Sequence, residues 1–157
     1  MTQFANNTSV SVERTKAEIE RLLARYGATQ FASGWDRGWA HIGFTISNRT
    51  IRVTLPLPDV ADKRFQMTPG GRKRRAPADQ ERAWEQACRS RWRALLLVIK
   101  AKLEAAASGI STIEDEFLAW TVLPGGHGQT IGDELRPQIA ARIIDGRVAP
   151  LLLTGTP

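Results

Sequence analysis

Hydrophobic residues near the start of the chain recur at helical spacing. In the stretch 11–26 (SVERTKAEIERLLARY) they would share one side of a helix, and Gly27 is suited to end it. These positions are Val12, Ile19, Leu22, Leu23 and Tyr26. The pattern predicts a first helix, preceded by a loose polar tail over residues 1–9.

The spacing then changes to the alternation of half-buried strands. Over 39–46 (WAHIGFTI), Ile42, Phe44 and Ile46 alternate with polar or small residues. Over 50–57 the apolar positions are the odd-numbered ones, and the polar turn 47–49 joins the two runs into a hairpin. A short apolar segment begins at Phe31 and would add a third strand, so a three-stranded meander is the alternative to the hairpin. Pro56 and Pro58 end the alternation, because proline cannot continue a ladder inside a sheet.

The segment 77–109 predicts a helix of about thirty residues, which Pro77 can begin and Gly109 can end. One side of this helix is apolar, with Trp84, Cys88, Trp92, Leu95, Leu96, Ile99 and Leu103. We therefore expect it to be the central helix of the core. Further apolar residues surround this stripe, and one hairpin with short helices offers limited cover, so a homodimer is also expected.

Two shorter helices are predicted after the central one. Ser111 and Glu114 have capping-box spacing at the start of STIEDEFLAWTV, and the Gly-rich segment 123–128 interrupts the chain. Thr130 can cap a last helix over 131–146, in which Pro137 predicts a kink. Leu151–Leu153 are expected to pack on the core. The result is an α+β fold with two to three antiparallel strands, in one domain over 10–153 followed by a tail over 154–157.

Composition limits the function classes. The chain has 157 residues, one cysteine and two histidines, which exclude an internal disulfide and a closed Cys/His zinc site. The longest uncharged apolar run, Ala94–Ile99, is far shorter than a membrane span, and the N-terminus does not resemble a signal peptide. We expect a soluble protein of the bacterial cytoplasm.

The net charge of +6 is concentrated in one stretch. Residues 63–77 (KRFQMTPGGRKRRAP) contain no acidic side chain, and the rest of the chain is neutral. A flexible basic loop over 58–77 suits a polyanion, because neutralised phosphates release their counterions. The alternative is a solvated loop that keeps the protein soluble. The candidate phosphate contacts are Lys63, Arg64, Arg72, Lys73, Arg74 and Arg75.

Further candidates for nucleic-acid contacts flank this loop. A helical wheel places a basic stripe on the central helix, formed by Arg82, Arg89, Arg93 and Lys100. In the turn GWDRGW, Trp35, Arg37 and Trp39 are suited to stack on unpaired bases, and Arg52 would lie on the polar face of the hairpin. Alternatively, the two tryptophans cover the sheet edge or cap the core.

The candidates for catalysis are few. His127 lies in a Gly-rich turn without a nucleophile at a known spacing, His41 lies on a strand, and Cys88 is expected to be a buried thiol. The contiguous acidic run Glu114–Glu116 would point in different directions on a helix. We predict no catalytic residues, no metal site and no cofactor.

Three segments, WEQACRSRWRALLLVIKAKLEAAASGI, EDEFLAWTVLP and LRPQIA, resemble a family of small phage and prophage (mobile-element) proteins. The resemblance extends from about Ser11 to Leu153 and is most specific between Trp84 and Glu104. That part contains Trp84, Glu85, Gln86, Arg89, Arg91, Trp92, Arg93, Lys100 and Lys102. The resemblance implies a bacterial mobile-element origin and work inside the infected or lysogenic cell, but no catalytic residue set.

The order helix, three strands, helix also resembles the double-stranded RNA-binding domain, with a longer loop before the second helix and additional C-terminal helices. We therefore predict a phage or prophage nucleic-acid-binding accessory protein of replication, recombination or regulation. The alternative is a protein-binding inhibitor of a host nuclease or CRISPR-type defence complex. Its cationic loop would occupy a nucleic-acid site, or its acidic run Glu114–Glu116 would mimic phosphate.

Overall fold

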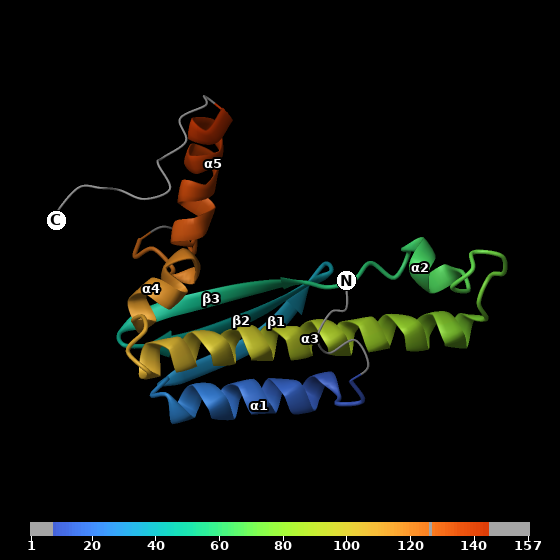
Figure 1. Cartoon of the computed structure of the whole chain (residues 1–157), viewed down its shortest axis with the longest axis horizontal. Coiled ribbons are helices and arrows are strands. Elements are labelled where there is room, and N and C mark those ends of the chain that lie inside the picture. Colours follow the sequence, from blue (N-terminus) through green and yellow to red (C-terminus); the bar gives the residue numbers. More distant parts are fainter. Residues whose placement is uncertain (1–7, 126, 145–157) are drawn as a thin grey trace.

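Helices and one three-stranded sheet follow each other in the order that the hydrophobic pattern predicts (Figure 1). The structure is a computed structural model that describes residues 8–125 and 127–144. Its elements are α1 (Val12–Arg25), β1 (Gln30–Asp36), β2 (Trp39–Ile46), β3 (Arg49–Pro56), α2 (Lys63–Gln66), α3 (Pro77–Ala107), α4 (Ile113–Phe117), the 3-10 turn η1 (Leu118–Trp120) and α5 (Ile131–Ile144). The α+β class is confirmed, with the three-stranded form of the sheet.

The sheet is antiparallel with the order β1-β2-β3, and two tight turns set its register. Arg37 and Gly38 form one turn, Ser47 and Asn48 the other, and all four have positive φ. Turns of this kind match the right-handed twist of the strands. The register pairs Phe44 with Ile51, so the alternating apolar residues of β2 and β3 share one face.

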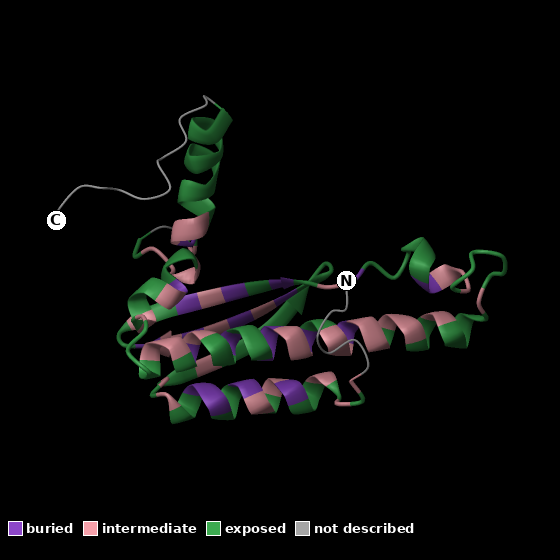
Figure 2. Cartoon of the chain, in the orientation of Figure 1, coloured by how far each residue is buried: buried purple, intermediate pink, exposed green. Residues whose placement is uncertain are grey.

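This apolar face is covered by α1 and α3, which lie side by side on the same side of the sheet (Figures 1 and 2). The Ser11 side chain accepts from the Arg14 amide at the start of α1, and Tyr26 and Gly27 follow its end. The buried core comprises Ile19, Leu22, Leu23, Ala40, Ile42, Phe44, Ile46, Ile51, Val53, Leu55, Trp92, Leu95, Leu96, Ile99, Leu103 and Phe117. The predicted apolar face of the central helix is confirmed from Cys88 onward, and Trp84 is half-buried.

The central helix α3 has 31 residues and extends well past the sheet (Figure 1). Its C-terminal half contacts α1, the sheet and α4, whereas its N-terminal half carries α2. Leu97 and Val98 stay partly exposed. α1, the sheet and α4 cover the apolar side of α3 from Trp92 onward, and the homodimer stays a prediction.

Residues 58–77, which we call the arm, were expected to form a flexible loop but contain regular structure. Asp62 caps the helical turn α2, and Met67 pairs with Arg74 in a short bridge. Phe65 is buried where α2 packs on α3, and the indole N–H of Trp84 donates to the Pro58 carbonyl at 2.8 Å. One apolar side chain within the basic run therefore anchors the arm.

The helix expected over 111–122 differs from the prediction. Thr112, not Ser111, caps α4 by accepting from the Asp115 amide, and α4 ends after five residues in the turn η1. Thr121 then bridges to Ile51, and Val122 bridges to Thr130. The β-branched residues Thr121 and Val122 favour this extended pairing at the sheet edge over further helix.

The last helix, α5, projects away from the body and buries none of its residues (Figures 1 and 2). Its first turn is held against η1, where a Cβ on Gly132 would come within 2.7 Å of the Ala119 carbonyl oxygen. Pro137 lies inside the helix, and Ile139 and Ile143 are exposed. The predicted tails and Leu151–Leu153 lie largely or wholly outside the described residues. None of the described helices has the length and apolar content to cross a membrane.

Phe117 tests whether α4 belongs to the core. Its ring is buried and meets Phe44 edge to face, with centroids 5.6 Å apart. We expect Phe117→Ala to lower the free energy of unfolding by about 3–5 kcal/mol, measured by urea denaturation. Ile110→Ala is the control, because Ile110 is 84% exposed, and should change it by less than about 0.5 kcal/mol. Equal effects of the two changes would contradict this role.

Candidate nucleic-acid interface

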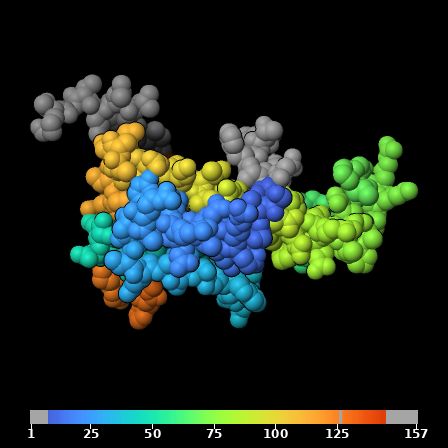
Figure 3. All heavy atoms as spheres, turned by 90° about the horizontal axis from the view of Figure 1, so that it is seen from below, coloured from blue at the N-terminus to red at the C-terminus, as the bar shows by residue number. Residues whose placement is uncertain are grey.

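The cations at the tip of the arm are exposed and lack acidic partners. Arg72, Lys73 and Arg74 are exposed, and none of them forms an ion pair within residues 8–125 and 127–144. Figure 3 shows the arm projecting beyond the body of the molecule. These three side chains therefore place free positive charge where a polyanion can reach it.

The other arm cations are used differently. Arg75 is half-buried and its Nε donates to the Met67 carbonyl at 2.9 Å, so it holds the bridge of the arm together. Arg64 pairs with Asp62 at 3.2 Å and covers the Phe65 ring. Lys63 is exposed, and no acidic side chain pairs with it in the described chain. The six predicted contacts thus divide into four free cations and two with structural roles.

The predicted stripe on α3 is mostly occupied by internal contacts. Arg93 pairs with Glu18 and so joins α3 to α1. Arg89 contacts residues one turn earlier in α3: its guanidinium donates to Gln86 Oε1 at 2.7 Å and lies 3.8 Å from Glu85. Arg82 pairs with Asp79. Of the four residues, Lys100 alone is exposed without an acidic partner in the described part of the chain.

The two tryptophans of the first hairpin lie on opposite faces of the sheet. Trp35 pairs with Ala40, whose side chain is in the core, so Trp35 lies on the helix side. Trp39 lies on the other face and is 48% exposed, against 79% for Trp35. They cannot form one stacking surface together. Arg37 occupies the turn between them, and its Nε lies 3.8 Å from the exposed Asp36 carboxylate.

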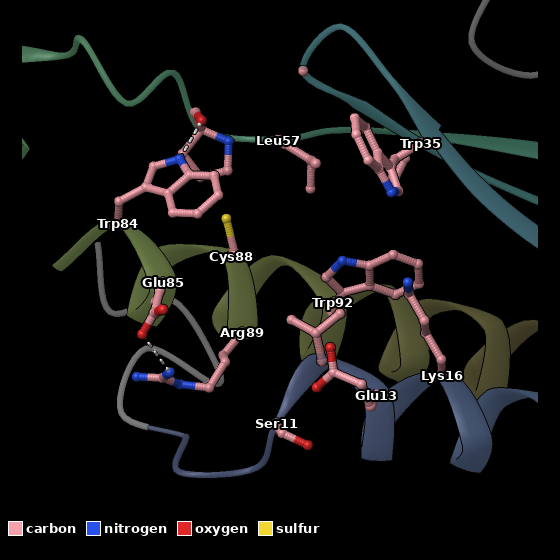
Figure 4. A pocket seen from close by; sticks show the side chains of 14 residues that line it. Ser11, Glu13, Lys16, Trp35, Leu57, Trp84, Glu85, Cys88, Arg89 and Trp92 are labelled. Atoms are coloured by element: carbon pink, nitrogen blue, oxygen red, sulfur yellow. Dashed lines mark hydrogen bonds and ion pairs between the residues drawn. The ribbon is translucent and has the colours of Figure 1, made fainter. Parts of the chain in front are cut away.

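A cleft of about 610 Å³ lies at the base of the arm, and the sequence did not predict it. Figure 4 shows Trp35, from the β1–β2 hairpin, across from Trp92 of α3, with Trp84 nearer the start of α3. Leu57 and Cys88 fill the space between Trp84 and the other two rings. Three indoles, one from the first hairpin and two from α3, therefore converge on one opening.

Charged groups surround this cleft without closing it. The Lys16 ammonium lies over the Trp92 ring, 4.9 Å from its centroid. Glu13, Glu85 and Arg89 line other parts of the rim. Burial, with a smaller contribution from Glu85, raises the pKa of the Cys88 thiol, so Cys88 is an apolar lining group at neutral pH.

Arg52, predicted as a contact on the open face of the hairpin, instead ties the sheet to α5. Its guanidinium lies 3.2 Å from Asp133, and its Nε is buried with no hydrogen-bond partner in the described chain. Trp39 and Trp120 line the same hollow of about 390 Å³. Hydrogen bonds from the Thr130 backbone and side chain, and then Arg52 and Arg136, lower the pKa of Asp133.

The acidic run Glu114–Glu116 does not form a free anionic surface. Glu114 pairs with Arg49, Asp115 accepts from the Thr112 hydroxyl at 2.8 Å, and Glu116 lies 3.4 Å from Lys102. This distribution weakens the idea that the run mimics phosphate. Within the described residues, no group of three or more His, Cys, Asp and Glu side chains could hold a metal ion.

Comparison with protein-family models, curated proteins and solved structures found no match to this chain. The order α1, three strands, α3 is that of the double-stranded RNA-binding domain, and both helices cover one face of the sheet (Figure 1). The arm, α4 and α5 are additional. The order of elements alone does not establish a function, so the function of the interface is argued from its own residues.

The contact between Arg93 and Glu18 predicts a structural role for Arg93. Their side chains are 29% and 27% exposed and join two helices of the core. In a double-mutant cycle with alanine at each position, we expect a coupling free energy of about 0.5–1 kcal/mol by urea denaturation. Lys100→Ala is the control and should leave stability unchanged. No coupling, together with weaker nucleic-acid binding by Arg93→Ala, would make Arg93 a phosphate contact instead.

The lowered pKa of Asp133 predicts how α5 is held. The pKa of Asp133 is lower in the folded protein than in the unfolded chain. The ionised carboxylate therefore stabilises the folded contact between α5 and the sheet fully above the unfolded pKa, and this stabilisation is lost as the pH falls through the folded pKa. We expect Asp133→Asn to speed amide hydrogen exchange in α5 at neutral pH, and its difference from wild type to shrink in acid. Glu134→Gln, in the same helical turn, is the control. Equal exchange in wild type and Asp133→Asn at neutral pH would contradict this anchoring.

Proposed function

We propose that the protein binds nucleic acid and that the tip of the arm makes the first phosphate contacts. The observation that carries this proposal is the exposure of Arg72, Lys73 and Arg74 without acidic partners in the described chain. Elsewhere, arginines such as Arg49, Arg93 and others are already paired with carboxylates. Arg72, Lys73 and Arg74 are consecutive, whereas exposed cations without an ion pair in the rest of the described chain, such as Arg25, Arg91 and Lys100, are spread over α1 and α3.

The form of the arm suits this role. It projects from the body, so phosphates can approach it without contacting α1 or the sheet (Figure 3). The arm has two acidic residues, and both serve local structure: Asp62 caps α2 and pairs with Arg64, and Asp59 accepts from the Ala61 amide. Bound phosphates would thus release counterions with little competition from nearby carboxylates.

A wider role follows as part of the same proposal. The resemblance of the chain to small phage and prophage proteins supports an accessory protein of replication, recombination or regulation. Such a protein would act in the cytoplasm of the bacterial host, where these nucleic acids are copied and transcribed. Binding that depends on phosphates rather than base edges suits an accessory role, because it follows the nucleic acid with little dependence on sequence.

A protein-binding inhibitor of a host nuclease or CRISPR-type defence complex is the second candidate, and α5 is the observation that favours it. Leu135, Ile139 and Ile143 are spaced one turn apart on this helix and are all exposed. An exposed apolar stripe of this kind is typical of helices that dock into a groove on a partner. In this case the arm would occupy the nucleic-acid site of the partner.

Salt-dependent binding tests the first proposal. Fluorescence anisotropy with labelled single-stranded DNA, duplex DNA and RNA should show affinity that falls as salt rises. In the double variant R72A/R74A, we expect weaker binding and a log–log salt slope smaller by roughly 1 to 2. Both side chains are exposed, so the variant should fold normally.

The matched control is R21A/R25A, which removes the same charge from exposed positions of α1. If both variants weaken binding equally, net charge rather than the arm governs the interaction, and the proposed contact is wrong. If the wild-type protein binds none of the three polymers at low salt, nucleic-acid binding is wrong. The α5 surface then becomes the site to examine.

A further inference from the structure

We propose that the cleft of Trp35, Trp84 and Trp92 binds an unpaired nucleobase, so that the protein prefers single-stranded over duplex nucleic acid. This inference rests on the proposed function, because it supplies the base contact beside the phosphate contacts of the arm. The cleft has a volume of about 610 Å³, which is within the range of pockets that bind small molecules. Nothing in the basic arm alone would distinguish single strands from duplexes.

The arrangement of the indoles suits stacking. Trp35 is 79% exposed and comes from the hairpin, whereas Trp92 is buried in α3 below it. Figure 4 shows Trp35 on the opposite side of the opening from Trp92. A planar base that enters here can stack on the exposed Trp35 ring, while the buried Trp92 ring forms the floor of the cleft. Base–aromatic stacking of this kind tolerates any sequence, because every base has a π face.

Polar groups at the cleft match the rest of a nucleotide. Lys16 has no acidic partner within residues 8–125 and 127–144 and lies at the mouth beside Trp92, where its ammonium can pair with a phosphate. Glu13, on the rim, can accept from an exocyclic amino group.

The cleft and the arm are continuous. Pro58, the first residue of the arm, lines the cleft and accepts the hydrogen bond of Trp84. Trp84 lies seven residues after the start of α3, which places the cleft roughly 10 Å along the helix from the end of the arm. A strand of a few nucleotides can therefore place its phosphates on Arg72 and Arg74 while one base occupies the cleft.

A comparison of oligonucleotides of about 12 nucleotides separates base binding from phosphate binding. The probes are oligo-dT, an abasic oligonucleotide with the same number of phosphates, a duplex of equal length, and oligo-U. We expect oligo-dT to bind roughly tenfold or more tightly than the abasic probe at the same salt concentration. Oligo-dT should also quench tryptophan fluorescence, and oligo-U reports whether DNA or RNA is preferred.

Trp35→Ala and Trp39→Ala form a matched pair, because both remove an exposed indole from the same hairpin and Trp39 lies on the opposite face. Trp35→Ala should lose most of the advantage of oligo-dT over the abasic probe and most of the quenching. Trp39→Ala should keep both. Circular dichroism and thermal melting of each variant confirm that the fold is intact before binding is compared.

Two results would overturn the inference in distinguishable ways. If wild-type protein binds the abasic probe as tightly as oligo-dT, the cleft holds no base, while the phosphate contacts of the arm and the proposed function stand. If neither probe nor the duplex binds at low salt, the proposed function fails and the cleft proposal fails with it. A loss in Trp39→Ala equal to that in Trp35→Ala would also contradict the assignment of the cleft.

Discussion

The length of α3 relative to the sheet is the constraint on which the rest of the molecule depends. A helix of 31 residues is about 46 Å long, whereas strands of eight residues such as β2 span about 26 Å. About 20 Å of helix thus extends past the sheet and needs other cover. The arm supplies it, because Phe65 packs there and Pro58 accepts the hydrogen bond of Trp84.

This mismatch also explains the cleft. Along α3 one apolar stripe runs continuously from Trp84 through Cys88 and Trp92 to Leu103, as the helical spacing predicts. The sheet covers the stripe only from Trp92 onward, and the arm covers it beyond Trp84. The cleft lies in the interval between the two covers, where Cys88 is part of its lining and the exposed indole of Trp35 reaches over it from the hairpin. The cleft therefore lies on α3 between the part that the sheet covers and the part that the arm covers.

Much of the fold could be predicted because its signals are local. The alternation of Ile42, Phe44 and Ile46 and the helical spacing in 11–26 depend only on near neighbours, and both elements are confirmed. Local signals also caused errors. Capping by Ser111 and Thr112 is equally plausible from sequence, and the pairing of Thr121 with Ile51 depends on a strand seventy residues earlier. Tertiary pairing overrode the helical tendency there.

The candidate site was less predictable, because it depends on which residues meet across long separations. The basic charge of the arm is a local property and was predicted, although the structural roles of Arg64 and Arg75 were not. A helical wheel cannot show that Glu18, 75 residues earlier, neutralises Arg93. The wheel therefore overstated the α3 stripe as a phosphate surface.

The same reasoning clarifies why the tryptophans were misjudged. From sequence, Trp35 and Trp39 flank one turn, and each was a candidate for stacking on bases. Strand pairing places them on opposite faces, so Trp35 joins Trp84 and Trp92 instead. Those partners are 49 and 57 residues away and were assigned to the core. An aromatic surface assembled from a hairpin and a helix in this way depends on the register of β1 and β2. A shift of one residue would turn Trp35 to the other face and dismantle the cleft.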